Sequence, residues 1–92
     1  MNKYKVFETD NFKKQIAGLD KHQAEQLYPK IKSIIYPQLR REPHYGPNIK
    51  KLKGYNPEIW RYRIGNYRIF FVIDHMENVV AIIAFKLGKD AY

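Results

Sequence analysis

The sequence predicts an α+β domain of the order β-α-α-β-β-β, in which two N-terminal helices pack on a twisted, mainly antiparallel sheet of four strands. Apolar residues recur at helical spacing between residues 10 and 39, which favours helices there. Residues 60–64 instead alternate between apolar and basic side chains, and residues 79–85 are nearly all apolar, which favours strands. A chain of 92 residues is about enough for one hydrophobic core, so residues 1–92 are expected to form a single domain.

The first strand and the first helix are predicted within residues 3–18. Residues 3–8 include several β-forming side chains and predict a short strand. Thr9 or Asp10 can then cap a helix in which apolar residues follow at spacings of four and three. Gly18 is expected to end this helix.

A longer helix is predicted from Asp20 onward. Asp20 and Gln23 have the form of a capping box, and an apolar face with helical spacing extends from there to Leu39. Pro29 lies inside this pattern, where a proline removes a hydrogen bond and clashes with the preceding turn, so a kink is expected; Pro37 could end the helix before Leu39. The Pro- and Gly-containing stretch that follows, residues 42–54, is predicted to be a loop with a short turn in its tail.

The most informative segment is a predicted hairpin around Gly65-Asn66, a two-residue loop of the type that makes tight turns. If these two residues form the loop, Arg63 faces Arg68 across the hairpin and Arg61 faces Phe70. One face then carries seven large apolar side chains and is expected to lie under the helices: Trp60, Tyr62, Ile64, Tyr67, Ile69, Phe71 and Ile73.

The opposite face of the hairpin presents Arg61, Arg63 and Arg68. Like charges directly across a hairpin destabilise it, so folding alone does not favour this arrangement. An anion bound between the guanidinium groups would convert the repulsion into charge-assisted hydrogen bonds. We interpret the three arginines as a phosphate site; the alternative is an exposed sheet face whose arginines lie over apolar neighbours and pair with Asp or Glu.

The net charge is concentrated in one part of the chain. Seventeen Lys and Arg residues against nine Asp and Glu residues give +8. Residues 30–68 hold ten of the basic and two of the acidic residues, and this difference equals the whole net charge. A localised positive charge predicts an anionic partner such as a nucleic acid, although a solvated basic surface stays open as the alternative.

Several classes of protein are excluded or disfavoured. The chain has no cysteine, which excludes disulfide scaffolds, thiolate metal sites and cysteine nucleophiles. Its apolar runs are far shorter than the roughly 20 residues of a membrane span, and its first residues lack the apolar region of a secretion signal, so a cytoplasmic location is expected. His22, His44 and His75 lack metal-ligand spacing, so neither a metal nor a cofactor is expected, although His44 or His75 could approach the site in three dimensions.

Two segments, Leu52-Lys53-Gly54 and residues 60–74 (Trp60-Arg61-Tyr62-Arg63-Ile64-Gly65-Asn66-Tyr67-Arg68-Ile69-Phe70-Phe71-Val72-Ile73-Asp74), resemble the signature of RelE/ParE superfamily toxins. The resemblance implies a RelE-like microbial RNase fold and a toxin of a type II toxin–antitoxin pair that a cognate antitoxin neutralises. The RelE branch of this superfamily cleaves mRNA in the ribosomal A site, whereas the ParE branch poisons DNA gyrase.

The resemblance favours the RelE branch. RelE-type nucleases carry basic residues at two alternate positions of the strand before the hairpin turn and an arginine just after it, and Arg61, Arg63 and Arg68 occupy these places. The predicted function is therefore an endoribonuclease toxin that acts on mRNA of the translating ribosome.

The C-terminal segment matches this family in part. Family members end with an arginine-rich turn and a nearby tyrosine, and Tyr92 matches that tyrosine. Gly88 or a neighbour stands where the family often has Arg or His, so Lys86 or Lys89 would supply that charge. RNA cleavage through the 2′-hydroxyl needs proton transfer and stabilisation of the transition-state charge, of which arginines mainly provide the second. Tyr92 or Lys89 would then handle protons or stacking. Unperturbed Arg and Tyr are poor bases, so the ribosome is expected to position the strand, and naked RNA should be cut slowly.

The predicted RNA-binding residues widen the cationic surface: Lys50, Lys51, Lys53, Lys86 and Phe70. The expected partners are the ribosome, mRNA and an acidic, partly disordered antitoxin, with no membrane and no metal. Two other functions stay open on the same fold, namely a ParE-like gyrase poison and a non-catalytic module that binds RNA or antitoxin.

Overall fold

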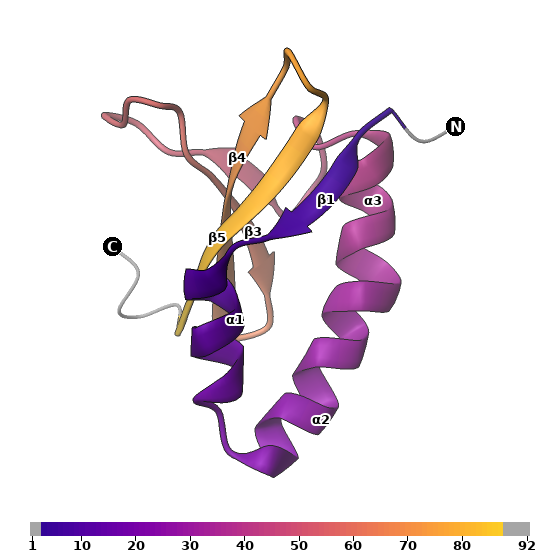
Figure 1. Ribbon diagram of the computed structural model, residues 1–92, viewed down its shortest axis with the longest axis vertical. Coiled ribbons are helices and arrows are strands. Elements are labelled where there is room, and N and C mark those ends of the chain that lie inside the picture. The colour runs from indigo at the N-terminus through magenta and orange to yellow at the C-terminus, as the bar shows by residue number, and fades with distance from the viewer. Residues whose placement is uncertain (1–2, 88–92) are drawn as a thin grey trace.

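A computed structural model describes residues 3–87 and has the α+β architecture that the sequence predicts (Figure 1). The helical segments are α1 (Asp10–Ala17), α2 (Lys21–Lys30), a π-helical segment η1 (Ile31–Ile35) and α3 (Tyr36–Arg41). The strands are β1 (Lys5–Glu8), β2 (Ile49–Lys51), β3 (Trp60–Ile64), β4 (Tyr67–Asp74) and β5 (Val79–Leu87). Among residues 3–87, no helix is long and apolar enough to cross a membrane.

The sheet has five strands in the order β1-β5-β4-β3-β2, so the predicted number of four was wrong. Strand β1 runs parallel to β5, and the other neighbours are antiparallel. The additional strand is β2, which lies in the segment predicted to be a loop and pairs Ile49 with Tyr62 of β3. Its three residues lie between Pro47 and Gly54, so local sequence indicates a turn, and only pairing with a distant strand makes this segment extended.

Both predicted helix starts are confirmed by their caps. The Thr9 hydroxyl accepts a hydrogen bond from the Phe12 N–H at 3.3 Å, and the Asp20 carboxylate accepts one from the Gln23 N–H at 2.9 Å. These side chains satisfy backbone donors that the first helical turn leaves without partners.

The second helical stretch, formed by α2, η1 and α3, changes from α-helical to π-helical hydrogen bonding after Pro29 and does not end at Pro37. Segment η1 follows α2 directly, and the Tyr36 N–H bonds the Ile31 carbonyl five residues back, which makes this turn a π-helix. Pro37 then lies in the first turn of α3, where a missing N–H is tolerated, and the helix continues to Arg41. The kink expected at Pro29 is therefore a widened turn just beyond it, and of the two predicted ends the one at Pro37 was wrong, because the helix continues past Leu39.

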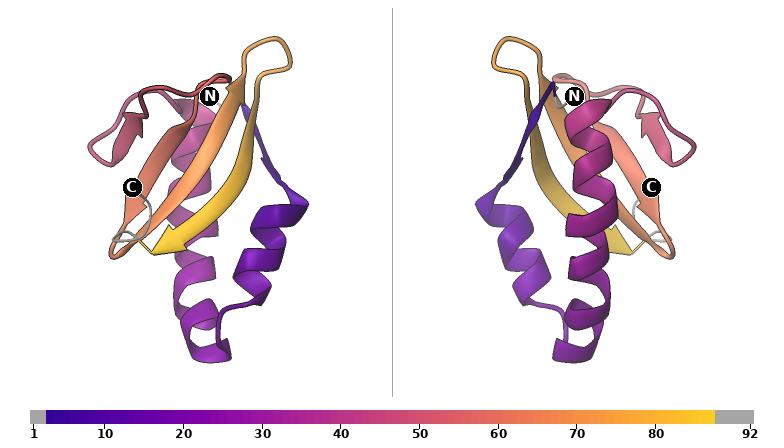
Figure 2. Two further views of the ribbon diagram at one scale, coloured as in Figure 1. Left: turned by 90° about the vertical axis from the view of Figure 1, so that its left-hand side faces the viewer. Right: turned by 90° about the vertical axis from the view of Figure 1, so that its right-hand side faces the viewer.

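The helices cover one face of the sheet and leave the other face open (Figure 2). The covered face is the predicted one: Tyr62, Ile69, Phe71 and Ile73 are buried in the core cluster, while the other predicted core residues pack against it. No helix of the described chain lies across the opposite face of β3, β4 and β5 (Figure 2, left). The sheet therefore has one face under the helices and one face that no helix within residues 3–87 covers.

The carboxylate of Glu8 connects strand β1 to helices α2 and α3 by hydrogen bonds. The Tyr28 hydroxyl lies 2.9 and 2.8 Å from the two oxygens of Glu8, and the Tyr36 hydroxyl donates to Glu8 Oε2 at 2.7 Å. Burial, followed by the contacts with the Glu8 carboxylate, raises the pKa of Tyr28 to about 12 and the pKa of Tyr36 still further. Both hydroxyls therefore remain donors to Glu8 at neutral pH.

This contact predicts a loss of stability in alkali. Because the folded protein holds the pKa of Tyr28 above its ordinary value of 10.0, the stabilisation is complete below pH 10 and declines as the pH rises toward 12. Chemical denaturation between pH 8 and 12 should therefore show a smaller alkaline loss for Tyr28→Phe than for the unmodified protein. Tyr45→Phe, at an exposed residue away from Glu8, is the matched control, and equal losses in all three proteins would contradict the assignment.

Candidate nucleic-acid interface

The β3–β4 hairpin has the predicted register. Gly65 has a φ of +55°, a left-handed conformation that glycine adopts without strain, and the strands pair outward from this turn. Arg63 is directly opposite Arg68, and Arg61 is opposite Phe70. Because side chains alternate between the two faces of a strand, the three arginines share the open face of the sheet.

The neighbouring strands extend this row of positive charges. Lys86 of β5 pairs with Arg68, and Lys50 of β2 pairs with Arg61, so both lysines point to the same side as the arginines. Residues Lys50, Arg61, Arg63, Arg68 and Lys86 together form what we call the cationic face. Four consecutive strands, β2 to β5, thus contribute charge to one surface.

The arginines differ in how they are held. Arg61 donates a hydrogen bond through NH1 to the Asn48 carbonyl at 2.8 Å, and Arg68 donates through NH1 to the Tyr67 carbonyl at 3.0 Å. Within the described chain, the Nε atom of Arg68 is buried and has no hydrogen-bond partner. Burying an unpaired donor costs about 1–3 kcal/mol. Arg63 is exposed to solvent. Fold stability therefore does not explain why an arginine occupies position 68.

Carboxylates within residues 3–87 do not neutralise Arg63 or Arg68. Neither arginine takes part in the ion pairs found in this part of the chain, which are Lys21–Glu25 at 4.0 Å, Glu42–His44 at 2.8 Å and Lys51–Glu58 at 3.1 Å. Arg63 and Arg68, which make no ion pair within residues 3–87, are directly opposite each other across the hairpin. Such a pair favours binding of an anion with several acceptor oxygens, as in a phosphate.

The remaining predicted site residues are distributed more widely. Lys51 pairs with Trp60, on the face opposite the arginines, and its Nζ bonds Glu58 at 3.1 Å. Lys53 is exposed in the loop after β2. Phe70 lies on the open face but is only 7% exposed, so a ligand can reach only a small part of its ring. Lys89 and Tyr92 lie outside the described residues.

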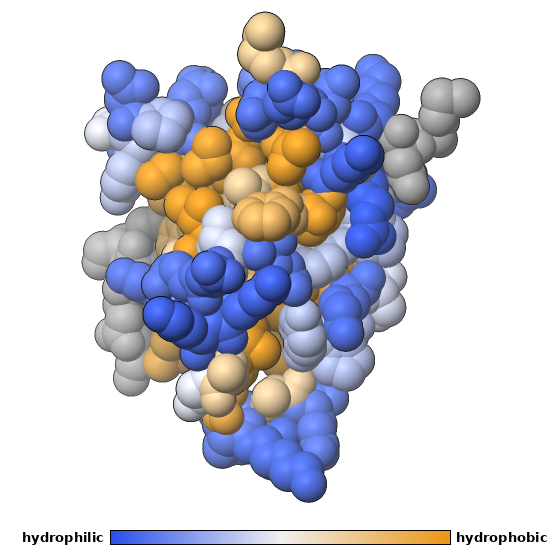
Figure 3. All heavy atoms as spheres, viewed as in Figure 1, coloured by the Kyte–Doolittle hydropathy of each residue, from blue (hydrophilic) through white to orange (hydrophobic). Residues whose placement is uncertain are grey.

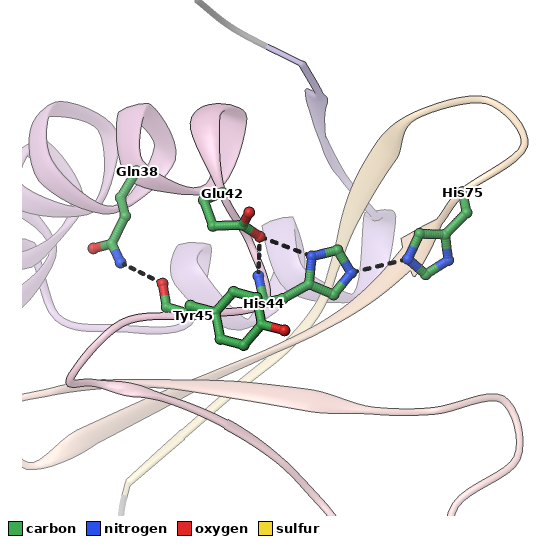
Figure 4. Close-up of polar contacts among 5 residues, drawn as sticks. All are labelled: Gln38, Glu42, His44, Tyr45 and His75. Carbon is green, nitrogen blue, oxygen red and sulfur yellow. Dashed lines mark hydrogen bonds and ion pairs between the residues drawn. The ribbon is translucent and has the colours of Figure 1, made fainter.

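Figure 4 shows a histidine network that the sequence pattern did not reveal. Glu42 Oε2 lies 2.8 Å from His44 Nδ1, and His44 Nε2 lies 2.9 Å from His75 Nε2. The bonds from the backbone and ring of His44 hold the pKa of Glu42 below its usual value. His75 follows Asp74, which is six residues from Arg68 along β4, or about 20 Å at 3.4 Å per residue. The network is therefore distant from Arg68, although the His44 ring lies 5.3 Å from the ring of Trp60, the residue before Arg61, whose side chain is on the opposite face of the sheet. Residues 3–87 contain no group of three or more ligands suited to a metal.

Comparisons with known proteins agree with this geometry. Residues 6–92 match the family model described as the ParE toxin of the type II toxin–antitoxin system parDE. No curated protein matches the chain. A small α+β domain with a charged open sheet face is thus identified as a toxin of the RelE/ParE superfamily. The chain belongs to the ParE toxin family.

Solved structures with the same fold include RelE toxins. RelE of the archaeal RelE–RelB complex from Pyrococcus horikoshii has 23% identity and a TM-score of 0.69, with 97% of this chain and 99% of that chain covered. The RelBE2 complex from Mycobacterium tuberculosis gives 17% identity and a TM-score of 0.69, with coverage of 91% and 96%. Isolated RelE from E. coli gives 22% identity and a TM-score of 0.64, with coverage of 92% and 84%. At these identities the similarity shows a shared fold.

The cationic face predicts salt-dependent binding of single-stranded RNA. The logarithm of the association constant should fall with the logarithm of salt concentration, by about 0.7 for each phosphate contact on a single strand. Arg63→Gln and Lys86→Gln should each reduce this slope by about that amount, measured by fluorescence anisotropy with a labelled uridine hexanucleotide. Lys51→Gln, on the other face, should leave the slope unchanged, whereas equal effects of all three substitutions would contradict the site.

Proposed function

We propose that this toxin is an endoribonuclease that cleaves mRNA on the translating ribosome through its cationic face. The observation that carries the proposal is the row Arg63–Arg68–Lys86, in which three permanent or near-permanent cations from three strands lie side by side. RNA presents a phosphate at every nucleotide, so such a row can bind consecutive groups of its backbone. The RelE-like fold supports the same conclusion.

The chemistry assigned to the arginines is stabilisation of charge. When the 2′-oxygen of a ribose attacks the adjacent phosphorus, negative charge grows on the phosphate oxygens before the bond to the 5′-oxygen breaks. Arginine donors positioned at those oxygens lower the barrier, and one such donor is worth about 10²- to 10³-fold in rate in other enzymes. A guanidinium group is a poor base, so we assign proton transfer to Tyr92 or Lys89 and strand positioning to the ribosome.

An acidic antitoxin is the second proposed partner. The solved relatives include a RelB–RelE antitoxin–toxin complex from Methanococcus jannaschii as well as the complex from P. horikoshii. The net charge of +8 on this chain favours a negatively charged partner that would also mask the cationic face from RNA.

A gyrase-directed toxin is the second candidate function, because the matching family model is that of ParE. The two candidates place different demands on the cationic face. Cleavage of RNA requires the arginines at the scissile phosphate, whereas binding to a protein target does not require this row as a catalytic unit.

Cellular expression separates the two functions. We expect induction of the toxin to stop growth and to create new 5′ ends within translated messages, mapped by sequencing of RNA ends. Arg68→Ala and Arg61→Ala should each lower cleavage about 10²-fold, because each removes a donor to the transition state. Lys51→Ala is the matched control and should retain full cleavage.

Other outcomes have defined meanings. Growth arrest with DNA breaks, without new RNA ends and with full toxicity of Arg68→Ala, would replace the nuclease with the gyrase-directed function. A wild-type protein that does not arrest growth would contradict both and indicate a non-catalytic binding module.

A further inference from the structure

A small apolar pocket opens on the same side of the sheet as the cationic face. The loop between β2 and β3 contributes Leu52, Tyr55 and Ile59, and the sheet contributes Phe70, Ala84 and Lys86. The volume of the pocket is about 170 Å³. The space-filling view shows hydrophobic residues gathered over β4 and β5 beside hydrophilic ones (Figure 3).

An irregularity in the sheet shapes this pocket. Phe70 pairs with Ala84 but Phe71 pairs with Ile82, so Ile83 is an extra residue in β5. Such a bulge bends a strand and redirects its side chains, and bulges are frequent next to functional sites. Both Ile83 and Ala84 line the pocket as a result. The small side chain of Ala84 leaves space above Phe70 that a larger residue would fill.

The size and chemistry of the pocket suit one aromatic ring. An engineered protein cavity of about 150 Å³ lined by Leu, Ile and Phe binds benzene, so a space of about 170 Å³ admits a ring of pyrimidine size. Tyr55 is 53% exposed, which leaves its ring available for stacking on a ligand. No carboxylate is among the described residues that line the pocket, so a ligand with a phosphate meets no repulsion there.

The pocket lies about as far from the positive charges as a nucleobase lies from the phosphate of its own nucleotide. Phe70 and Ala84 form the cross-strand row next to the row of Arg68 and Lys86, and rows two residues apart on one face are separated by about 7 Å. Lys86 belongs to both the pocket and the cationic face. A nucleotide bound by its phosphate at Arg68 and Lys86 can therefore direct its base into the pocket.

We propose that this pocket binds a pyrimidine-sized nucleobase of the RNA strand whose phosphate lies on Arg63, Arg68 and Lys86. The proposal rests on the proposed function, since the cationic face supplies the strand. The pocket adds a contact with a nucleobase, whereas the cationic face contacts only the phosphate backbone.

The test compares two oligonucleotides of equal charge: a uridine hexanucleotide and the corresponding abasic ribose-phosphate hexamer. The unmodified protein should bind the uridine hexamer about 5- to 150-fold more tightly, the range expected for one base stacked on an aromatic side chain. Tyr55→Ala should remove most of this preference and leave the affinity for the abasic hexamer unchanged. Ala84→Leu, which fills the pocket, should have the same effect.

Tyr45→Ala is the matched control, because Tyr45 is 77% exposed and does not line the pocket. A base preference that persists in both Tyr55→Ala and Ala84→Leu would overturn the pocket proposal, as would an equal loss of affinity for both hexamers in Tyr55→Ala. Failure of the proposed function would give a different result. If Arg63→Gln did not change the affinity for the abasic hexamer, the phosphate assignment would be overturned, even if Tyr55→Ala still removed the base preference.

Discussion

The register of the β3–β4 hairpin determines both the core and the candidate site. A two-residue loop beginning at Gly65 fixes which residues face each other, and burial of Tyr62 and Ile69 fixes which side of the hairpin lies under the helices. A shift of one residue would exchange the two faces and bury the arginines. The favourable free energy of burying the apolar face therefore also keeps Arg63 and Arg68 on the open face.

The open face combines features that work against stability and in favour of binding. Arg63 lies opposite Arg68, and the Nε atom of Arg68 is buried without a partner among the described residues. Strands β2 and β5 each add a lysine to the same surface. Within residues 3–87, every other buried side-chain nitrogen or oxygen has a hydrogen-bond partner, and the Glu8 carboxylate accepts hydrogen bonds from two tyrosine hydroxyls. This contrast between the two sides of the molecule is typical of a surface maintained for a ligand.

Much of this arrangement is predictable from sequence, because it depends on local patterns. The Gly-Asn loop and the period-two alternation before it give the hairpin register, and the caps at Thr9 and Asp20 give the helix starts. Strand β2 was not predicted, because its three residues become extended only through pairing with β3. The contact between His44 and His75 joins residues 31 positions apart, and no local spacing indicates it. The apolar pocket likewise depends on a bulge in β5, which follows from pairing with β4 rather than from local sequence.

The electrostatic coupling between Arg63 and Arg68 tests most directly whether these arginines serve the binding of a nucleic acid rather than the fold. A double-mutant cycle of Arg63→Gln and Arg68→Gln, followed by urea denaturation at low salt, measures their coupling in the free protein and with saturating uridine hexanucleotide. We expect repulsion of about 0.2–1 kcal/mol in the free protein and its loss or reversal when RNA is bound. A favourable coupling in the free protein that RNA leaves unchanged would show that the two arginines serve the fold and not a nucleic acid.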